Sequence, residues 1–194
     1  MSDVTLRPAT AADIAALSEL GTESFVAAFG DMYQPEDLAA FLAETKSEAA
    51  IAAQIADPAG PIQLATRGAR LLGYCKIGLG CGWPEFARGS KAMELKQLYI
   101  AGDATGLGIG AMLMDWAMAE FSARGADEIQ LSVYSGNHGA QRFYARYGFA
   151  KVADVTFRVG PQLDHVRARH DAREPQGSTP DRTTVEADRR RDPR

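Results

Sequence analysis

Apolar residues in the first sixty positions recur at intervals of three and four, which is the spacing of one face of an α-helix. Thr10 and Asp13 form the pattern of a capping box just before this spacing begins. Pro35 and Ser47 are typical helix-start residues for two further segments, and Pro58 ends the last of them. We therefore expect a short strand at residues 3–7, followed by three helices.

After residue 60 the apolar positions alternate, as they do in strands with one buried face. The strands that this pattern predicts cover residues 61–66, 69–80, 91–100, 129–135, 149–159 and 164–169. One predicted helix follows a glycine-rich segment and ends at Arg124-Gly125, and another covers residues 137–148. Together these elements predict one α/β domain over residues 1–170.

The end of the chain has a different composition. Residues 172–194 hold six arginines, five acids and three prolines, and almost nothing apolar. Such a segment cannot bury enough apolar surface to become ordered. We expect a disordered charged tail over residues 171–194.

The strand at residues 91–100 changes phase within itself. Met93 and Leu95 alternate, and so do Leu98 and Ile100, but the two pairs are out of step by one residue. A β-bulge near Lys96 and Gln97 would bring both pairs to one face. It would also release N–H and C=O groups of residues 98–100 from the sheet, where a ligand with amides can pair with them.

Composition and charge exclude several classes of protein. The apolar fraction of 46% is enough for a self-supporting core, and the net charge of −4 gives no reason to expect a nucleic-acid partner. No apolar run is long enough to span a membrane, and the first ten residues lack the apolar region of a signal peptide. Cys75 and Cys81 have neither the spacing nor the histidine neighbours of a metal site. We expect a cytoplasmic protein without a metal.

Three glycines, Gly106, Gly108 and Gly110, stand between a strand and a helix, where backbone N–H groups bind phosphates. A nucleoside-triphosphate loop is excluded, because Lys-Ser/Thr should follow the last glycine and Ala-Met stands there. A dinucleotide site matches better, with Asp127 as its acid. However, five residues separate the loop from its strand, and Asp127 precedes the next strand instead of ending it.

Two segments together resemble the motifs of the GNAT superfamily, the acetyl-CoA-dependent N-acetyltransferases. The segment from Thr105 to Gly110 is similar to motif A, which has Arg or Gln where this chain has Thr105. The segment from Asn137 to Phe149 is similar to motif B, with its Asn, Ala, Phe-Tyr and Gly-Phe. The order and separation of the two motifs are more specific than either alone. The N-terminal residues are similar to the bacterial polyamine and small-amine branch, and the resemblance covers roughly residues 3–170.

The resemblance implies a mixed, bent sheet of six or seven strands flanked by four or five helices, with acetyl-CoA between two splayed central strands. It implies direct acetyl transfer to a primary amine, with a backbone N–H near Ile100 binding the oxyanion. The residues that it places against acetyl-CoA are Leu98, Tyr99, Ile100, Thr105, Gly106, Leu107, Gly108, Ile109, Gly110 and Asn137. Thr105 weakens the side-chain part of phosphate binding and leaves the backbone part intact.

Two side chains are candidates for the proton transfers. Tyr144 stands where motif B commonly has its general acid, and the alternative is a tyrosine packed against the sheet. Glu94 stands where related sequences often have an acid, and it is the candidate general base, directly or through water. The alternative for Glu94 is a solvated strand carboxylate. Asn137 is equally a helix N-cap, and Tyr99 is a weaker candidate base.

The sequence leaves several classes of amine as the acetyl acceptor. Ten acids against two bases, Arg7 and Lys46, in the first sixty residues favour a cationic acceptor such as a polyamine. Solvated helix faces are the alternative interpretation of these acids. Peptide, lysine, amino-acid and antibiotic amines all stay open. The residues that could form an apolar lining on this side are Phe25, Phe29, Met32 and Tyr33.

Two further alternatives remain. Thr105 favours a non-catalytic module that binds an acyl-CoA or a partner protein on the same fold, whereas Tyr144 favours the enzyme. A homodimer is compatible with the sequence, with the last strand or the N-terminal helices as its edge.

Overall fold

The computed structural model describes residues 4–157 and 166–173. The helices are α1 (Ile14–Phe29), α2 (Pro35–Thr45), α3 (Glu48–Ala56), α4 (Ile109–Ala123) and α5 (His138–Arg146). The strands are β1 (Thr5–Pro8), β2 (Ile62–Arg67), β3 (Arg70–Gly78), β4 (Ala92–Ile100), β5 (Glu128–Tyr134), β6 (Ala150–Phe157) and β7 (Val166–Arg173). Of the tail predicted over residues 171–194, residues 171–173 form the end of β7, where they pair with β5 and β6, and the rest lies outside the described residues.

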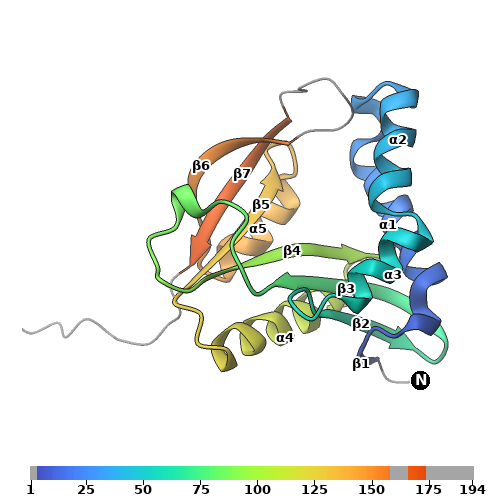
Figure 1. The fold of residues 1–194 in the computed structure, drawn as a ribbon, viewed down its shortest axis with the longest axis horizontal. Coiled ribbons are helices and arrows are strands. Elements are labelled where there is room, and N and C mark those ends of the chain that lie inside the picture. The colour runs from blue at the N-terminus through green and yellow to red at the C-terminus, as the bar shows by residue number, and fades with distance from the viewer. Residues whose placement is uncertain (1–3, 158–165, 174–194) are drawn as a thin grey trace, which may run out of the picture.

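All seven strands form one sheet in the order β1-β2-β3-β4-β5-β7-β6. The β4–β5 pair is parallel and is connected through α4, whereas the other neighbouring pairs are antiparallel. Helices α4 and α5 cover one face of the sheet, and α1 and α3 cover the other (Figure 1). This architecture confirms the predicted α/β fold with its mixed sheet and flanking helices.

Each face of the sheet has its own apolar core. On the α4 side, Leu113 and Phe121 are fully buried against Leu131 of β5. On the α1 side, Leu17 and Ile51 pack on β2 and β3. Burying a side chain of this size stabilises the fold by about 1.5–3 kcal/mol. Within the described part of the chain, none of the helices has the length and apolar run needed to cross a membrane.

The start of α1 confirms the predicted capping box. The Asp13 carboxylate accepts hydrogen bonds from the backbone N–H and the hydroxyl of Thr10, at 2.8 and 2.9 Å. The Arg7 guanidinium donates to both oxygens of the same carboxylate, at 2.6 and 2.8 Å. These contacts hold the pKa of Asp13 well below its usual range, chiefly through Arg7. They fix the entry of α1 against β1.

The predicted β-bulge lies in β4 at Lys96. Lys76 of β3 pairs with Gln97, and the next residue, Ile77, pairs with Leu95, so Lys96 is the extra residue. Met93 and Leu95 before the bulge, and Leu98 and Ile100 after it, all pack into the core on the α4 side. The bulge therefore brings both apolar pairs to the same face of the sheet, as the sequence predicts.

The sheet opens where the bulge occurs. β4 and β5 pair over four residues, from Ala92 opposite Glu128 to Leu95 opposite Leu131. Both strands continue beyond that point, β4 to Ile100 and β5 to Tyr134. In Figure 1, β5 rises away from β4 together with β6 and β7. The splayed central strands that the resemblance implies are present.

Candidate active site

A cavity of about 800 Å³ lies beside the gap between β4 and β5, and α1 and α2 form its other wall. Aromatic rings dominate that wall. Phe25 lies 4.9 Å from Phe29 and 4.7 Å from Phe41 between ring centroids, and Phe29 meets Tyr134 of β5 at 5.7 Å. A cavity of this size holds a small acceptor together with the reacting end of a second substrate.

Two of the predicted cofactor-binding residues direct backbone groups into the gap. The N–H of Ala101 donates to the carbonyl of Leu72 of β3 at 2.9 Å, which fixes the hydrogen-bonding positions along β4. Alternate residues of a strand direct their N–H and C=O groups to opposite sides. Tyr99 therefore directs its backbone groups toward β3. Leu98 and Ile100 direct theirs toward the place that β5 has left.

The glycine loop leads into the N-terminus of α4. Gly106 and Gly108 have φ of +82° and +80°, a conformation that favours glycine. Gly108 is the N-cap of α4, so the first N–H groups of the helix, from Ile109 onward, face the loop. Thr105 is exposed, and Leu107 is 54% exposed. This arrangement of backbone N–H groups suits a phosphate, and Thr105 adds no charge to it.

Tyr144 reaches the cavity from the α5 side. It lines the cavity, and its side chain is buried beside Phe143 and Phe149. Burial raises the pKa of its hydroxyl well above the ordinary tyrosine value, with further contributions from Cys75 and Tyr99. The hydroxyl therefore keeps its proton throughout the physiological pH range, as a proton donor requires.

Glu94 has a different setting from Tyr144. Among the described residues, those that line the cavity include its neighbours Leu95 and Lys96 but not Glu94 itself. The carboxylate is buried under Gly82, and the Nζ of Lys96 lies 3.2 Å from its Oε2 as an ion pair, without the angle of a hydrogen bond. The Lys96 side chain, which lines the cavity, is therefore the ion-pair partner that connects Glu94 to it.

The loop over Glu94 is held by the start of β5. The Oε2 of Glu128 accepts hydrogen bonds from the N–H groups of Arg88 and Gly89, at 2.7 and 2.9 Å. The Oδ2 of Asp127 accepts from the N–H and the hydroxyl of Ser90, both at 2.7 Å. Asp127 therefore has a structural role in this loop and has no ribose-binding position at the end of a strand.

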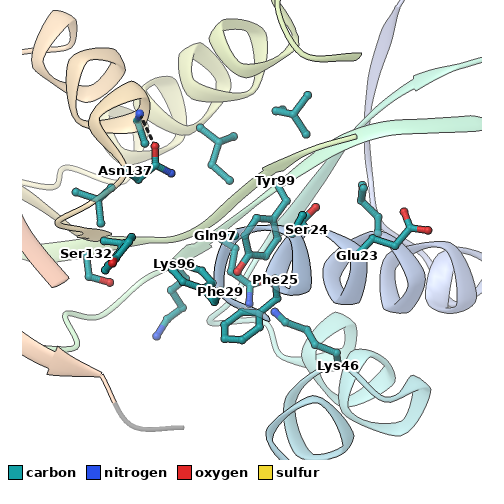
Figure 2. A pocket seen from close by; sticks show the side chains of 18 of the residues that line it. Glu23, Ser24, Phe25, Phe29, Lys46, Lys96, Gln97, Tyr99, Ser132 and Asn137 are labelled. Atoms are coloured by element: carbon teal, nitrogen blue, oxygen red, sulfur yellow. Dashed lines mark hydrogen bonds between the residues drawn. The ribbon is translucent and has the colours of Figure 1, made fainter. Parts of the chain in front are cut away.

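Asn137 and Tyr99 also line the cavity. The side-chain oxygen of Asn137 accepts from the N–H of Ala140 at 2.9 Å, so Asn137 is the N-cap of α5 (Figure 2). Burial raises the pKa of Tyr99 to about 12, which keeps its hydroxyl protonated and argues against a role as base. Of the expected apolar lining, Phe25, Phe29 and Tyr33 contribute to the wall. Met32 is 39% exposed and lies outside it.

Lys46, which no sequence motif marks as a site residue, lines the cavity with only 3% of its surface exposed. Its Nζ lies 5.1 Å from the centroid of the Tyr99 ring, and Figure 2 shows the side chain reaching toward Tyr99 and Gln97. Burial, followed by repulsion from Lys76, lowers its pKa from 10.5 to about 8. The sequence offers one signal for Lys46, because it is one of two basic residues among the first sixty, the other being Arg7.

Replacing Lys46 by methionine is expected to raise the free energy of unfolding at pH 7 by about 3 kcal/mol, because a buried charge is removed. Between about pH 8 and 10.5 the unfolded chain keeps the lysine proton that the folded chain releases. The wild type therefore gains stability relative to the variant as the pH rises through this window. Urea denaturation of both proteins at the two ends of the window measures this. A difference that does not change with pH would contradict the buried charge.

Comparison with known proteins adds to this geometry. A model of the acetyltransferase (GNAT) family matches residues 21–149. An uncharacterised N-acetyltransferase of Mycobacterium tuberculosis is 31% identical over 155 residues, which cover 79% of this chain and 94% of that protein.

Solved structures share the fold. The PaiA N-acetyltransferase of Thermoplasma acidophilum in complex with coenzyme A has a TM-score of 0.71 at 19% identity, over 89% of this chain and 99% of that one. The YncA protein of Salmonella typhimurium, solved with its cofactor acetyl-CoA, has a TM-score of 0.62 at 18% identity, over 93% of this chain and 99% of that one.

Proposed function

The chain belongs to the acetyltransferase (GNAT) family, and from this premise we propose that it transfers the acetyl group of acetyl-CoA directly to a primary amine bound in the cavity beside Tyr99. The observation that carries the proposal is the opening of the sheet at Lys96. It leaves the N–H and C=O groups of Leu98 and Ile100 directed into a gap beside the cavity. The thioester of acetyl-CoA supplies the activated acetyl group.

The described residues are suited to acetyl-CoA along its length. An amide-containing pantetheine arm pairs with Leu98 and Ile100 as an added strand does. The pyrophosphate then lies at the N-terminus of α4, against the loop of Gly106 and Gly108. Asn137, at the edge of the same cavity, has a side-chain amide N–H available for the arm, because its oxygen is used in capping α5.

The backbone also stabilises the charge that develops during transfer. When the amine attacks the thioester carbonyl, negative charge forms on the carbonyl oxygen. The N–H of Ile100 or of Leu98, directed into the gap, is the donor for this oxyanion. Tyr144, whose buried hydroxyl keeps its proton, donates a hydrogen bond to the thioester sulfur and gives it the proton as the C–S bond breaks, and water then restores the tyrosine proton.

Glu94 is the proposed general base, acting through water. A primary amine has a pKa of about 10 and must lose a proton before it attacks. Because Glu94 lies beneath the loop and Lys96 stands between it and the cavity, a water molecule has to carry the proton. Lys96 also holds the carboxylate toward the bulge.

Substituting Glu94→Gln is therefore expected to lower kcat/KM for the amine by roughly ten- to a hundredfold at pH 7. The loss should shrink toward pH 9.5, because more of the amine is then already deprotonated. Initial rates across this pH range measure it, and Glu85→Gln, an exposed carboxylate of the same loop, is the matched control. A loss that stays constant with pH would assign Glu94 a structural role instead.

Two classes of amine are candidates for the acetyl acceptor. A polyamine is favoured by the acidic composition of the first sixty residues, although Glu23 is the one acid among those that the structure describes there to line the cavity. An amino acid or peptide amine is favoured by the aromatic wall and by the buried Lys46.

The release of free thiol from acetyl-CoA tests the proposed function. The purified protein is supplied with polyamines, amino acids, amino-acid amides, aminoglycosides and lysine peptides in turn, and mass spectrometry identifies the acetylated product. Turnover with one class of amine is the expected result. Acetyl-CoA binding without turnover on any amine would instead favour the alternative, a non-catalytic acyl-CoA-binding or protein-interaction module, which is the interpretation that Thr105 supports.

A further inference from the structure

Lys46 is a buried cation in a cavity that is otherwise lined largely by apolar groups. Its backbone is fixed on both sides, because its carbonyl accepts from the hydroxyl of Ser18 at 2.6 Å and its N–H donates to the carbonyl of Leu42 at 2.8 Å. The side chain then passes Gly21, where a Cβ would lie 3.3 Å from the Cδ of Lys46. A glycine in α1 thus leaves room for this lysine to reach the cavity.

The charge of Lys46 has no carboxylate partner within residues 4–157 and 166–173. The ion pairs there are Arg7–Asp13, Arg70–Asp103, Lys96–Glu94, Arg124–Glu120 and Lys151–Asp154. The other cavity lysine, Lys96, is paired with Glu94, and Glu23 at the cavity wall is exposed. A buried, unpaired ammonium group costs stability, so its retention beside a substrate cavity indicates a ligand that completes the pair.

The position of Lys46 relative to the gap limits what that ligand can be. Tyr99 lies between Leu98 and Ile100, whose backbone groups face the acetyl-CoA gap, while its ring contacts the Nζ of Lys46. An acceptor that reaches the gap with its amine can therefore place a second group against Lys46. The rings of Phe25, Phe29 and Phe41 then surround its apolar body.

We propose that Lys46 binds an anionic group of the acceptor, so that the substrate is an amine that also carries a carboxylate and an apolar side chain, as an amino acid does. This inference rests on the proposed acetyl transfer. A polyamine is disfavoured, because it would place a second cation beside a buried one. Charge-assisted hydrogen bonds from an ammonium to a carboxylate are strong when both groups are withdrawn from water.

Matched acceptors test the proposal. L-phenylalanine is compared with its amide and with 2-phenylethylamine, which keep the ring and the amine but lack the carboxylate, and O-phosphoethanolamine tests a phosphate in its place. The wild type is expected to use phenylalanine with a kcat/KM at least about tenfold above the two analogues that lack the carboxylate. In Lys46→Met this preference should collapse through a higher KM for phenylalanine, with the KM for acetyl-CoA unchanged. Lys91→Met, an exposed lysine outside the cavity, should keep it.

Several results would overturn the inference while leaving acetyl transfer intact. These are equal use of the three matched amines, a preference for polyamines or for the phosphate, a preference that survives Lys46→Met, and acetylation of Lys46 itself. Calorimetric titration with N-acetyl-phenylalanine separates the hypothesis of an anion site at Lys46 from the hypothesis of acetyl transfer. Binding that is lost in Lys46→Met, without thiol release on any amine, would uphold the anion site and contradict the proposed transfer.

Discussion

Tyr144→Phe is expected to lower kcat for acetyl transfer by roughly a hundred- to a thousandfold, with the KM for acetyl-CoA nearly unchanged. The substitution removes one hydroxyl and keeps the ring against Phe143 and Phe149. The leaving thiolate then departs without a proton donor. Steady-state kinetics with varied acetyl-CoA separate kcat from KM, and thermal unfolding checks that the variant is folded.

Tyr147→Phe is the matched control for this prediction. Tyr147 lies one residue past the end of the same helix, and its hydroxyl donates to Asp115 at 3.0 Å. Losing this exposed contact should change kcat by less than about twofold. Equal losses in the two variants, or full activity in Tyr144→Phe, would remove Tyr144 from the proposed mechanism.

Gly108→Val should raise the KM for acetyl-CoA by roughly tenfold or more and affect kcat much less. Gly108 has φ of +80°, and a residue other than glycine there costs about 1–2 kcal/mol, more when the side chain is β-branched. Relief of that strain turns the loop and moves the first N–H groups of α4 away from the pyrophosphate. Calorimetric titration with coenzyme A measures the loss independently of turnover.

Gly110→Ala adds a methyl group two residues further on and is the control. Its φ is not positive, and the new Cβ would lie 3.8 Å from the ring of Phe143, which is an ordinary contact. The affinity for coenzyme A should stay within about twofold of the wild type. A similar loss in both variants would argue against a phosphate site built on the backbone of this loop.

The features of the site that lie within one stretch of chain were predictable from the sequence. The phase change between Leu95 and Leu98 predicted the bulge, because buried residues of a strand must share one face. The bulge in turn predicted which segment of β4 leaves the ladder. The glycines of this segment predicted an exposed backbone loop before a helix, and in the structure Gly106 and Gly108 have a positive φ that few other residues adopt without strain.

The features that depend on contacts between distant segments were not predictable in this way. Alternation placed the Glu94 side chain on one face, but the loop that covers it is held by Glu128, which is 34 residues away in the sequence. Nothing in the sequence around Lys46 marked it as a buried residue. Its burial results from the packing of α1 and α3 on β3 around it, which no local pattern encodes.

Amide hydrogen exchange at single-residue resolution, with and without acetyl-CoA, tests the central claim that acetyl-CoA occupies the gap between β4 and β5. Slower exchange on binding is expected at Leu98 and Ile100 and at the first N–H groups of α4, from Ile109 onward. Tyr99, whose N–H already faces β3, should change much less. Binding of acetyl-CoA without added protection at Leu98 and Ile100 would show that it does not occupy this gap.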